Sequence, residues 1–375
     1  MSSRLMLSTR ILLSAMLLTI AGRASAQDPT MPPAGEPHSA QPAAPEPLPN
    51  IVVLATGGTI AGKAGTNVQA GYTSGQVGVD ELLKAVPEAR KLAHLRGEQV
   101  ANIGSQDMND SVWIKLADRV NALLAEPDVD GIVITHGTDT IEETAYFLDL
   151  VVKSRKPVVL TAAMRPATAL SADGPLNFYN AVAVAGDKGA IGRGVMVVAN
   201  DWVHDAATLT KTSTTAVQTF MSPMTGLLGT VNYGEIEWFR GPVGRNTIGS
   251  SFSVTKSTVL PRVDIVMAYE NMDGSLLNAA AAAGARGIVI AGVGNGNLTE
   301  AALDAAEALA KRGIVVVRAS RVSTGQVGRD VEVDDDKLGF VASLAKNPPK
   351  ARVLLRLALT RTSDVRTIQN WFDVY

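Results

Sequence analysis

The sequence predicts an α/β protein with a larger N-terminal doubly wound domain, whose sheet is mostly parallel, and a smaller C-terminal open α/β domain. Short runs that are apolar at every position alternate with segments in which apolar residues recur at helical spacing. Strands of this kind are buried on both faces, which is typical of a parallel sheet covered by helices. Between Tyr233 and Pro261 neither the apolar runs nor the helical spacing continues, and glycine and proline are frequent. This stretch therefore divides the strands and helices into two series, one for each domain.

The first series sets out the elements of the N-terminal domain. Strands are expected at residues 51–54, 131–135, 158–161 and 195–199. Helices are expected over residues 112–124, from residue 141, and from residues 171–175 onward. Asp110 or Ser111 would cap the first of these helices. For Asp139 or Thr140, capping the second helix is the structural alternative to a role in chemistry.

The second series repeats the pattern on a smaller scale. Strands are expected at residues 263–267, 287–291 and 314–317, with helices over residues 276–284 and 299–311. This is a βαβ arrangement, and its length suits a compact open sheet. The acidic run at residues 331–336 is expected to be a solvated loop.

The composition indicates a globular protein without a nucleic-acid partner. Hydrophobic residues make up 46% of the 375 residues, and the formal net charge is -2. Cysteine is absent, which excludes disulfides and thiol chemistry. No cofactor is expected, since the histidines, His38, His94, His136 and His204, lack metal-ligand spacing. His136 is expected to be structural rather than catalytic.

The N-terminus has the pattern of a cleavable secretion signal. Arg4 and Arg10 precede an apolar run at residues 11–20, and the small-x-small tripeptide at residues 24–26 follows it. A signal peptide at residues 1–26 is predicted, so the mature protein should be exported, which means the periplasm if the source is a Gram-negative bacterium. The run is shorter than the roughly 20 apolar residues that cross a bilayer, so no membrane span is expected.

Composition changes along the chain predict the remaining boundaries. They are a proline- and alanine-rich disordered linker at residues 27–48, an N-terminal α/β domain at 49–240, an interdomain linker at 241–261 and a C-terminal α/β domain at 262–375. Polar candidates for a site gather in the N-terminal domain.

The first candidate for chemistry is Thr59. It follows the predicted strand at residues 51–54 and two glycines, Gly57 and Gly58. A loop at the carboxyl end of such a strand opens into the crevice where α/β proteins bind ligands. The glycines would let backbone N–H groups approach an anionic oxygen closely, as an oxyanion hole beside a nucleophile requires.

A phosphate-binding loop is the alternative interpretation of this stretch. Residues 57–63 match that motif, but Ala64 stands where it needs a serine or threonine to hold magnesium. The loop must also lead directly into a helix, and residues 64–67 are poor helix formers. The nucleotide interpretation is therefore disfavoured.

Four motifs together resemble the bacterial type II L-asparaginases and the related glutaminase-asparaginases. They are ATGGTIA at residues 55–61, GSQD at 104–107, THGTDT at 135–140 and AMRP at 163–166. The resemblance extends from about Pro49 to Tyr375. It implies an amidohydrolase that converts asparagine, and to some extent glutamine, to the acid and ammonia through a covalent acyl-enzyme.

The resemblance also implies the roles of individual residues. Thr59 would be the nucleophile and Tyr72 part of the lid that closes on it, while Thr138, Asp139 and Lys211 would form the second catalytic group. Ser105, Gln106 and Asp139 would hold the α-carboxylate and α-amino groups of the substrate, and the Ala163 carbonyl would touch its amide. Asn297 and Glu332 would reach the site of a neighbouring subunit in a homotetramer.

Two questions stay open at this point. The sequence does not decide whether Thr59 or Thr138 attacks first, although the glycine loop favours Thr59. A periplasmic amino-acid-binding protein, which also has two α/β domains and a cleft, is the alternative to an enzyme. Release of ammonia from asparagine would separate the two.

Overall fold

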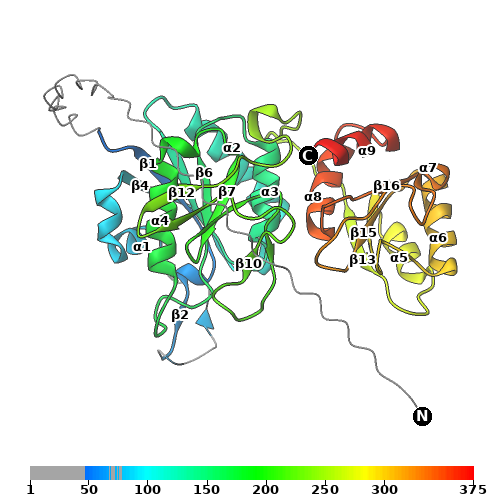
Figure 1. Ribbon diagram of the computed structural model, residues 1–375, viewed down its shortest axis with the longest axis horizontal. Coiled ribbons are helices and arrows are strands. Elements are labelled where there is room, and N and C mark those ends of the chain that lie inside the picture. The colour runs from blue at the N-terminus through cyan, green and yellow to red at the C-terminus, as the bar shows by residue number, and fades with distance from the viewer. Residues whose placement is uncertain (1–46, 67, 69–71, 74, 76–77) are drawn as a thin grey trace, which may run out of the picture. The chain divides into compact units, whose positions relative to one another are not determined.

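The computed structural model describes residues 47–66, 68, 72, 73, 75 and 78–375 (Figure 1). The predicted signal peptide and all but the last two residues of the predicted disordered linker lie outside the described residues. In the described part of the chain, no helix is long and apolar enough to cross a membrane.

The N-terminal part is built on an eight-stranded mixed sheet. Its strands, in spatial order, are β12 (Glu235–Trp238), β11 (Gly229–Asn232), β8 (Trp202–Asp205), β7 (Val195–Ala199), β6 (Val158–Thr161), β5 (Gly131–Thr135), β1 (Asn50–Gly57) and β4 (His94–Ile103). The five strands from β7 to β4 are parallel, and β8, β11 and β12 extend the sheet in antiparallel fashion. The predicted mostly parallel sheet is confirmed.

Both faces of this sheet are buried, as the uninterrupted apolar runs predict. In β1, Val52 and Leu54 belong to one hydrophobic cluster, whereas Ile51 and Val53 belong to another. Alternate side chains of a strand point to opposite faces, so each face has its own core. The helices of these two cores are α2 (Asp110–Leu124) and α3 (Ile141–Val151) for the first, and α1 (Val79–Ala85) and α4 (Gly174–Gly186) for the second.

The strand order reverses at β1. The chain leaves β1, adds β4 on one side of it, and then returns to place β5 on the other side. In open α/β sheets, ligands bind at the carboxyl ends of the strands where the order reverses. The loops after β1 and β5 therefore form the expected crevice.

The structure corrects the predicted helix caps. Helix α2 begins at Asp110, and its cap is Asn109, whose Oδ1 accepts a hydrogen bond from the Val112 amide at 3.2 Å. Thr140 precedes α3, but its hydroxyl makes no capping bond, because it donates to the Ser105 carbonyl at 2.7 Å. The cap predicted at Asp110 or Ser111 was thus displaced by one residue.

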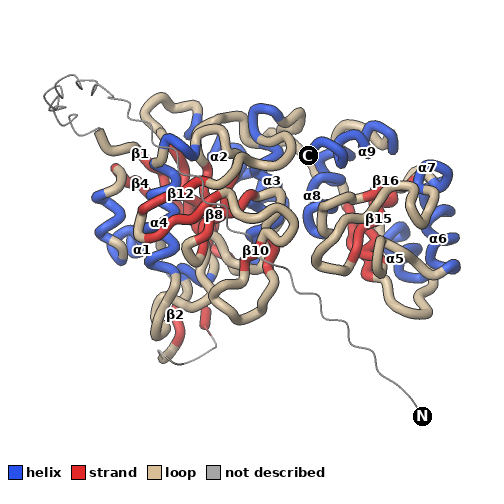
Figure 2. The backbone as a smooth tube through the Cα atoms, viewed as in Figure 1, coloured by secondary structure: helices blue, strands red, loops and turns tan. Residues whose placement is uncertain are grey.

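The C-terminal part holds a four-stranded parallel sheet, which confirms the second α/β domain. Its strands, in spatial order, are β13 (Val263–Met267), β14 (Gly287–Gly292), β15 (Val315–Ser320) and β16 (Phe340–Ala342). Its helices are α5 (Ser275–Ala282), α6 (Glu300–Lys311), α7 (Asp335–Leu338), α8 (Pro348–Leu359) and α9 (Val365–Val374). Figure 2 distinguishes these helices and strands by colour.

Residues 331–334 of the acidic run form a largely exposed loop, as the sequence predicts, but Asp335 departs from that prediction. Asp335 is fully buried at the start of α7, and both of its carboxylate oxygens accept hydrogen bonds at 2.6 Å from Arg318, itself only 1% exposed. Charge runs are usually solvated, but a cation seventeen residues earlier in β15 neutralises this one member of the run.

Candidate active site

The loop that carries Thr59 is pressed against the loop after β5. Gly57 and Gly58 have φ angles of 111° and 83°, which residues with a side chain rarely adopt. A Cβ at Gly58 would lie 2.4 Å from the backbone nitrogen of Gly137. Glycine at this position therefore allows the contact between the two loops. Thr59 follows in a short 3₁₀ turn, Thr59–Ala61, and is 4% exposed.

The structure adds two details to the interpretation of this loop. The amide of Gly58 donates to the Ile103 carbonyl at 3.1 Å, so an oxyanion donor from this loop would have to be another backbone amide. The segment beyond Gly62 is the short strand β2 (Lys63–Ala64), and a phosphate-binding loop would need a helix there. The structure thus removes the nucleotide interpretation.

Thr138, Asp139 and Lys211 form one hydrogen-bonded group. The ammonium of Lys211 donates to the Thr138 hydroxyl at 2.9 Å and to the Asp139 carboxylate at 2.6 Å. Thr138 is buried and the side chain of Lys211 is 18% exposed, whereas that of Asp139 is 57% exposed. The ammonium of Lys211 thus fixes the Thr138 hydroxyl at the carboxyl end of the sheet.

Ser105 joins this group from a third loop. It lies in the 3₁₀ turn Ser105–Asp107 that follows β4. Its buried hydroxyl accepts a hydrogen bond from the Asp139 amide at 3.1 Å, and its carbonyl accepts the Thr140 hydroxyl. Gln106, the next residue, is exposed at the same turn. The loops after β1, β4 and β5 therefore meet in one place.

Ala163 belongs to a fourth loop, after β6, and is almost fully buried. Asp173 shapes this loop, because its carboxylate accepts hydrogen bonds from the amides of Met164 and Arg165, both at 2.9 Å. Asn177 adds a bond to the Ala162 carbonyl at 3.0 Å. Sequence reasoning missed Asp173 and Asn177, since their position before and inside a helix suggested only a helix start.

The remaining predicted residues belong to other elements. Tyr72 is in the two-residue strand β3 (Tyr72–Thr73), and its side chain is outside the described part of the structure. Asn297 and Glu332 belong to the C-terminal domain, where the amide of Asn297 donates to the Glu332 carboxylate. The pairing places two predicted binding residues side by side.

His136 and His204 are buried and uncharged at neutral pH. Burial lowers the pKa of each imidazole to about 4, and the hydrogen bond from His136 to the Gly137 carbonyl, at 2.8 Å, only partly opposes this. A neutral, enclosed imidazole suits a structural role. Among the described residues, no group of three or more His, Cys, Asp or Glu side chains could hold a metal ion.

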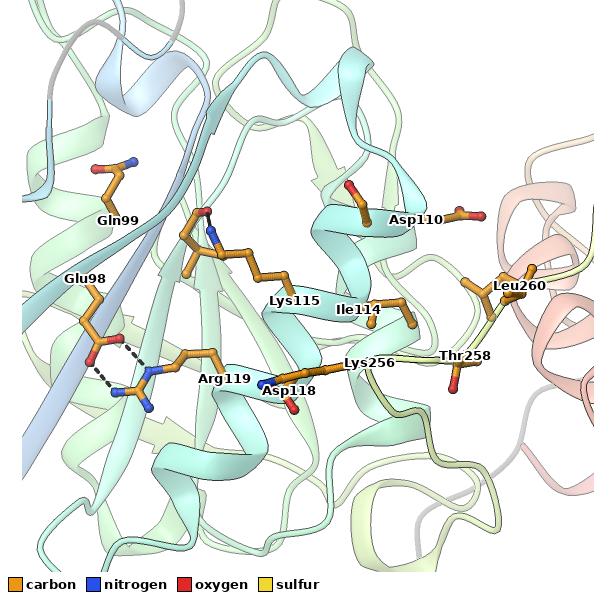
Figure 3. Close-up of a pocket in the computed structure, with 13 residues that line it drawn as sticks. Glu98, Gln99, Asp110, Ile114, Lys115, Asp118, Arg119, Lys256, Thr258 and Leu260 are labelled. Carbon is orange, nitrogen blue, oxygen red and sulfur yellow. Dashed lines mark hydrogen bonds and ion pairs between the residues drawn. The ribbon is translucent and has the colours of Figure 1, made fainter.

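A cavity of about 690 Å³ lies away from these loops, between β4, α2 and the segment at residues 256–260 (Figure 3). Most of the charges that line it are paired, and the ammonium of Lys115 donates to the Val100 carbonyl at 2.5 Å. Arg119 donates to both carboxylate oxygens of Glu98, at 2.6 and 2.7 Å, and thereby lowers the pKa of that carboxyl. Asp110 and Asp118 have partners in Arg356 and Lys256. Paired charges of this kind favour a structural role for the cavity wall.

A doubly wound domain with a hydroxyl, a lysine and a carboxylate at its crevice is typical of an α/β enzyme that acts on a small molecule bound at the carboxyl ends of the strands. The chain matches the family profile "Asparaginase, N-terminal" over residues 50–244 and "Glutaminase/Asparaginase C-terminal domain" over residues 262–372. It belongs to the type II L-asparaginase family and is an amidohydrolase of that family. The amino-acid-binding protein weighed above is therefore set aside.

Named relatives agree with this assignment. The chain is 57% identical to "Probable L-asparaginase periplasmic" of Haemophilus influenzae, over 87% of this chain and 93% of that protein, and 54% identical to "L-asparaginase 2" of Escherichia coli, over 88% and 94%. It is 45% identical to "Glutaminase-asparaginase" of Pseudomonas fluorescens, over 88% and 91%. Among solved structures, "Probable Cytoplasmic L-asparaginase" from Campylobacter jejuni matches with a TM-score of 0.85 and 46% identity, over 87% of this chain and all of that one.

Proposed function

We propose that the enzyme hydrolyses L-asparagine to L-aspartate and ammonia, and L-glutamine to a lesser extent, with Thr59 as the nucleophile. The observation that carries this proposal is the hydrogen-bonded group of Thr138, Asp139 and Lys211, beside the glycine loop of Thr59. The names of the relatives support the substrate, since both asparaginases and a glutaminase-asparaginase are among them.

The reaction divides into two steps. The Thr59 oxygen attacks the side-chain amide carbon, the C–N bond breaks, and the hydroxyl proton leaves with ammonia. Water then cleaves the ester and returns a proton to Thr59. A threonine hydroxyl needs a nearby base, and proton transfer of this kind contributes about 100- to 10,000-fold to the rate. Thr138 and Lys211 are the proposed route for that proton.

Substrate recognition is assigned to the surrounding loops. Ser105, Gln106 and Asp139 would hold the α-carboxylate and α-amino groups, and the Ala163 carbonyl would accept a hydrogen bond from the side-chain amide. Tyr72 would close over the bound substrate. Asparagine and glutamine differ by one methylene, which a pocket distinguishes by only about 1 to 3 kcal/mol, so some turnover of both amides is expected.

Location and assembly complete the proposal. The predicted signal peptide and a relative named as periplasmic support export to the periplasm. We propose a homotetramer in which Asn297 and Glu332 complete the site of a neighbouring subunit. The pairing of these two side chains in the C-terminal domain is consistent with a shared binding element.

The direct test is ammonia release by the purified mature protein with each amide in turn. We expect repeated turnover with asparagine and a lower kcat/KM with glutamine. Uptake of asparagine without release of ammonia would refute the proposed activity.

Shared sites can be tested by mixing two inactive variants. Thr59→Ala removes the nucleophile, and Asn297→Ala combined with Glu332→Ala removes the element from the neighbour. If sites are shared, subunits refolded together will form some sites with both wild-type parts, and activity will return. Activity that stays at the level of the separate variants would contradict sharing.

A further inference from the structure

The segment that carries Lys211 has little support of its own. Lys211 lies in β9 (Thr210–Lys211), a two-residue strand that pairs only with β10 (Phe220–Met221), outside the main sheet. A pair of such short strands is marginally stable. The backbone at Lys211 therefore needs support from another element if Lys211 is to keep its hydrogen bonds to Thr138 and Asp139.

That element is the beginning of α8, which belongs to the C-terminal part of the same chain. Asn347 caps this helix, and Lys350 lies in its first turn. The ammonium of Lys350 donates to the carbonyl of Leu209 and, at 3.1 Å, to the carboxylate of Glu142. Asn347 donates to the same carboxylate at 3.2 Å and lies 3.4 Å from the Thr210 hydroxyl.

Lys350 thus connects the two segments that meet in the site. Leu209 is two residues before Lys211, and Glu142 is three residues after Asp139. The side chain of Lys350 is only 2% exposed and that of Glu142 is 12% exposed, so water screens this ion pair little. The two side chains of a buried ion pair have fewer alternative positions than those of an exposed pair.

We propose that Lys350, with Glu142 and Asn347, is a positioning residue that sets the distance between Lys211 and Thr138. It touches neither substrate nor reacting atoms, and acts by fixing the backbone on both sides of the group. The inference rests on the proposed hydrolysis by Thr59 and Thr138. A misplacement of about 1 Å in such a group can cost about 100-fold in rate.

A second buried cation on α8 supplies a matched control. Arg356 is 6% exposed, and both carboxylate oxygens of Asp110, at the start of α2, accept its hydrogen bonds at 2.8 and 2.6 Å. It therefore joins the same helix to the N-terminal domain, but its partner lies on α2 instead of the segments around Lys211. Loss of Arg356 should destabilise the protein without altering the geometry of the site.

The experiment compares Lys350→Met, Lys350→Arg and Arg356→Met in steady-state hydrolysis of asparagine and in thermal unfolding. We expect Lys350→Met to lower kcat by about 10- to 100-fold with KM changed less than about threefold. Lys350→Arg, which keeps the cation, should recover most of that loss. Arg356→Met should lower the melting temperature similarly while kcat stays within about threefold of the wild type.

Asn347→Ala extends the test to a milder change. It removes the smaller contact to Glu142 and Thr210, and should lower kcat in the same sense by a smaller factor. Equal loss of kcat in Lys350→Met and Arg356→Met at equal stability, or unchanged kcat in Lys350→Met, would overturn the inference. Failure of the wild type to release ammonia would instead refute the proposed function.

Discussion

At the scale of single residues, the glycine pair before Thr59 explains why a hydroxyl can stand where the strand order reverses. Gly58 adopts a φ of 83°, and its missing side chain leaves room for the backbone of Gly137. The loop of the first threonine thereby reaches the loop of the second. A side chain at Gly58 would have to displace backbone atoms, which cannot rotate away as a flexible side chain can.

The first prediction concerns Thr59. Thr59→Ala removes the proposed nucleophile, and we expect kcat for asparagine to fall by at least about 10,000-fold while the melting temperature changes little. Thr59→Ser keeps a hydroxyl and is the matched control, with most of the activity retained. Substantial turnover by Thr59→Ala would move the attack to Thr138.

At the residue scale, the family resemblance grouped side chains that the structure brings together, and their catalytic roles stay a prediction. Lys211 is hydrogen-bonded to Thr138 and Asp139, although it lies more than seventy residues from them and its own stretch of sequence has the pattern of a surface lysine. Glu142 and Lys350 were not predicted as partners, because they are separated by 208 residues and each alone has the pattern of an ordinary helix residue. A single sequence does not reveal such a contact.

At the scale of elements, the buried pair of Arg318 in β15 and Asp335 in α7 supports the loops of the predicted neighbour-binding residues. Arg318 also donates to the carbonyls of Asn295 and Gly328, each at 3.0 Å. Those residues lie next to the chain positions of Asn297 and Glu332. One side chain thus joins two loops whose own backbone pairing is limited, among the described residues, to the isolated bridges of Val293 with Asn297 and of Val327 with Leu344.

The second prediction follows from that burial. Arg318→Met leaves the carboxylate of Asp335 without its cation, and we expect the free energy of unfolding to fall by about 3 to 5 kcal/mol. Lys311→Met is the control, since the pair of Lys311 and Glu307 on α6 is largely exposed and is worth at most about 0.5 kcal/mol. Denaturant unfolding of both variants measures the difference, and equal losses would contradict the argument.

Element types were predictable where burial is uniform along a strand. The parallel strands β1, β5, β6, β7, β14 and β15 are buried almost throughout and have mostly apolar runs, so they were found. The parallel strand β4 is largely polar and half-exposed and was missed. Strand β12 alternates between exposed and half-buried residues over only four positions and was missed as well. The capping of α2 by Asn109 was missed for a different reason. Several residues with capping side chains follow one another there, and only backbone geometry decides among them.

At the scale of the whole molecule, buried titratable groups couple stability to pH. His136 and His204 have a pKa of about 4 in the folded protein, against 6.5 for a free imidazole. The unfolded chain binds more protons between these values, so the folded state is favoured above pH 6.5 and loses stability as the pH falls toward 4. Burial raises the pKa of Asp149, which acts in the opposite direction.

The third prediction isolates one histidine from these opposing effects. His204→Gln removes a titrating ring, so the variant should lose about 3 kcal/mol less stability than the wild type between pH 7 and pH 4. His94→Gln changes an exposed ring and serves as the control. Urea unfolding at pH 7, 5 and 4 measures the free energies. Parallel pH dependence in His204→Gln and the wild type would show that burial does not depress this pKa.

The ion pair between Lys350 of α8 and Glu142 of α3 bears on whether the two halves of this chain can be exchanged independently. Two family profiles divide it near residue 250, as if each half were a unit that could be transferred to another protein. Yet the N-terminal half, which carries both threonines, contains the largely buried carboxylate of Glu142, whereas its partner, the ammonium of Lys350, belongs to the C-terminal half. A gene fragment ending before residue 262 would carry the proposed reacting groups without the helix that we propose aligns them, so recombination among relatives should preserve the two halves as a matched pair.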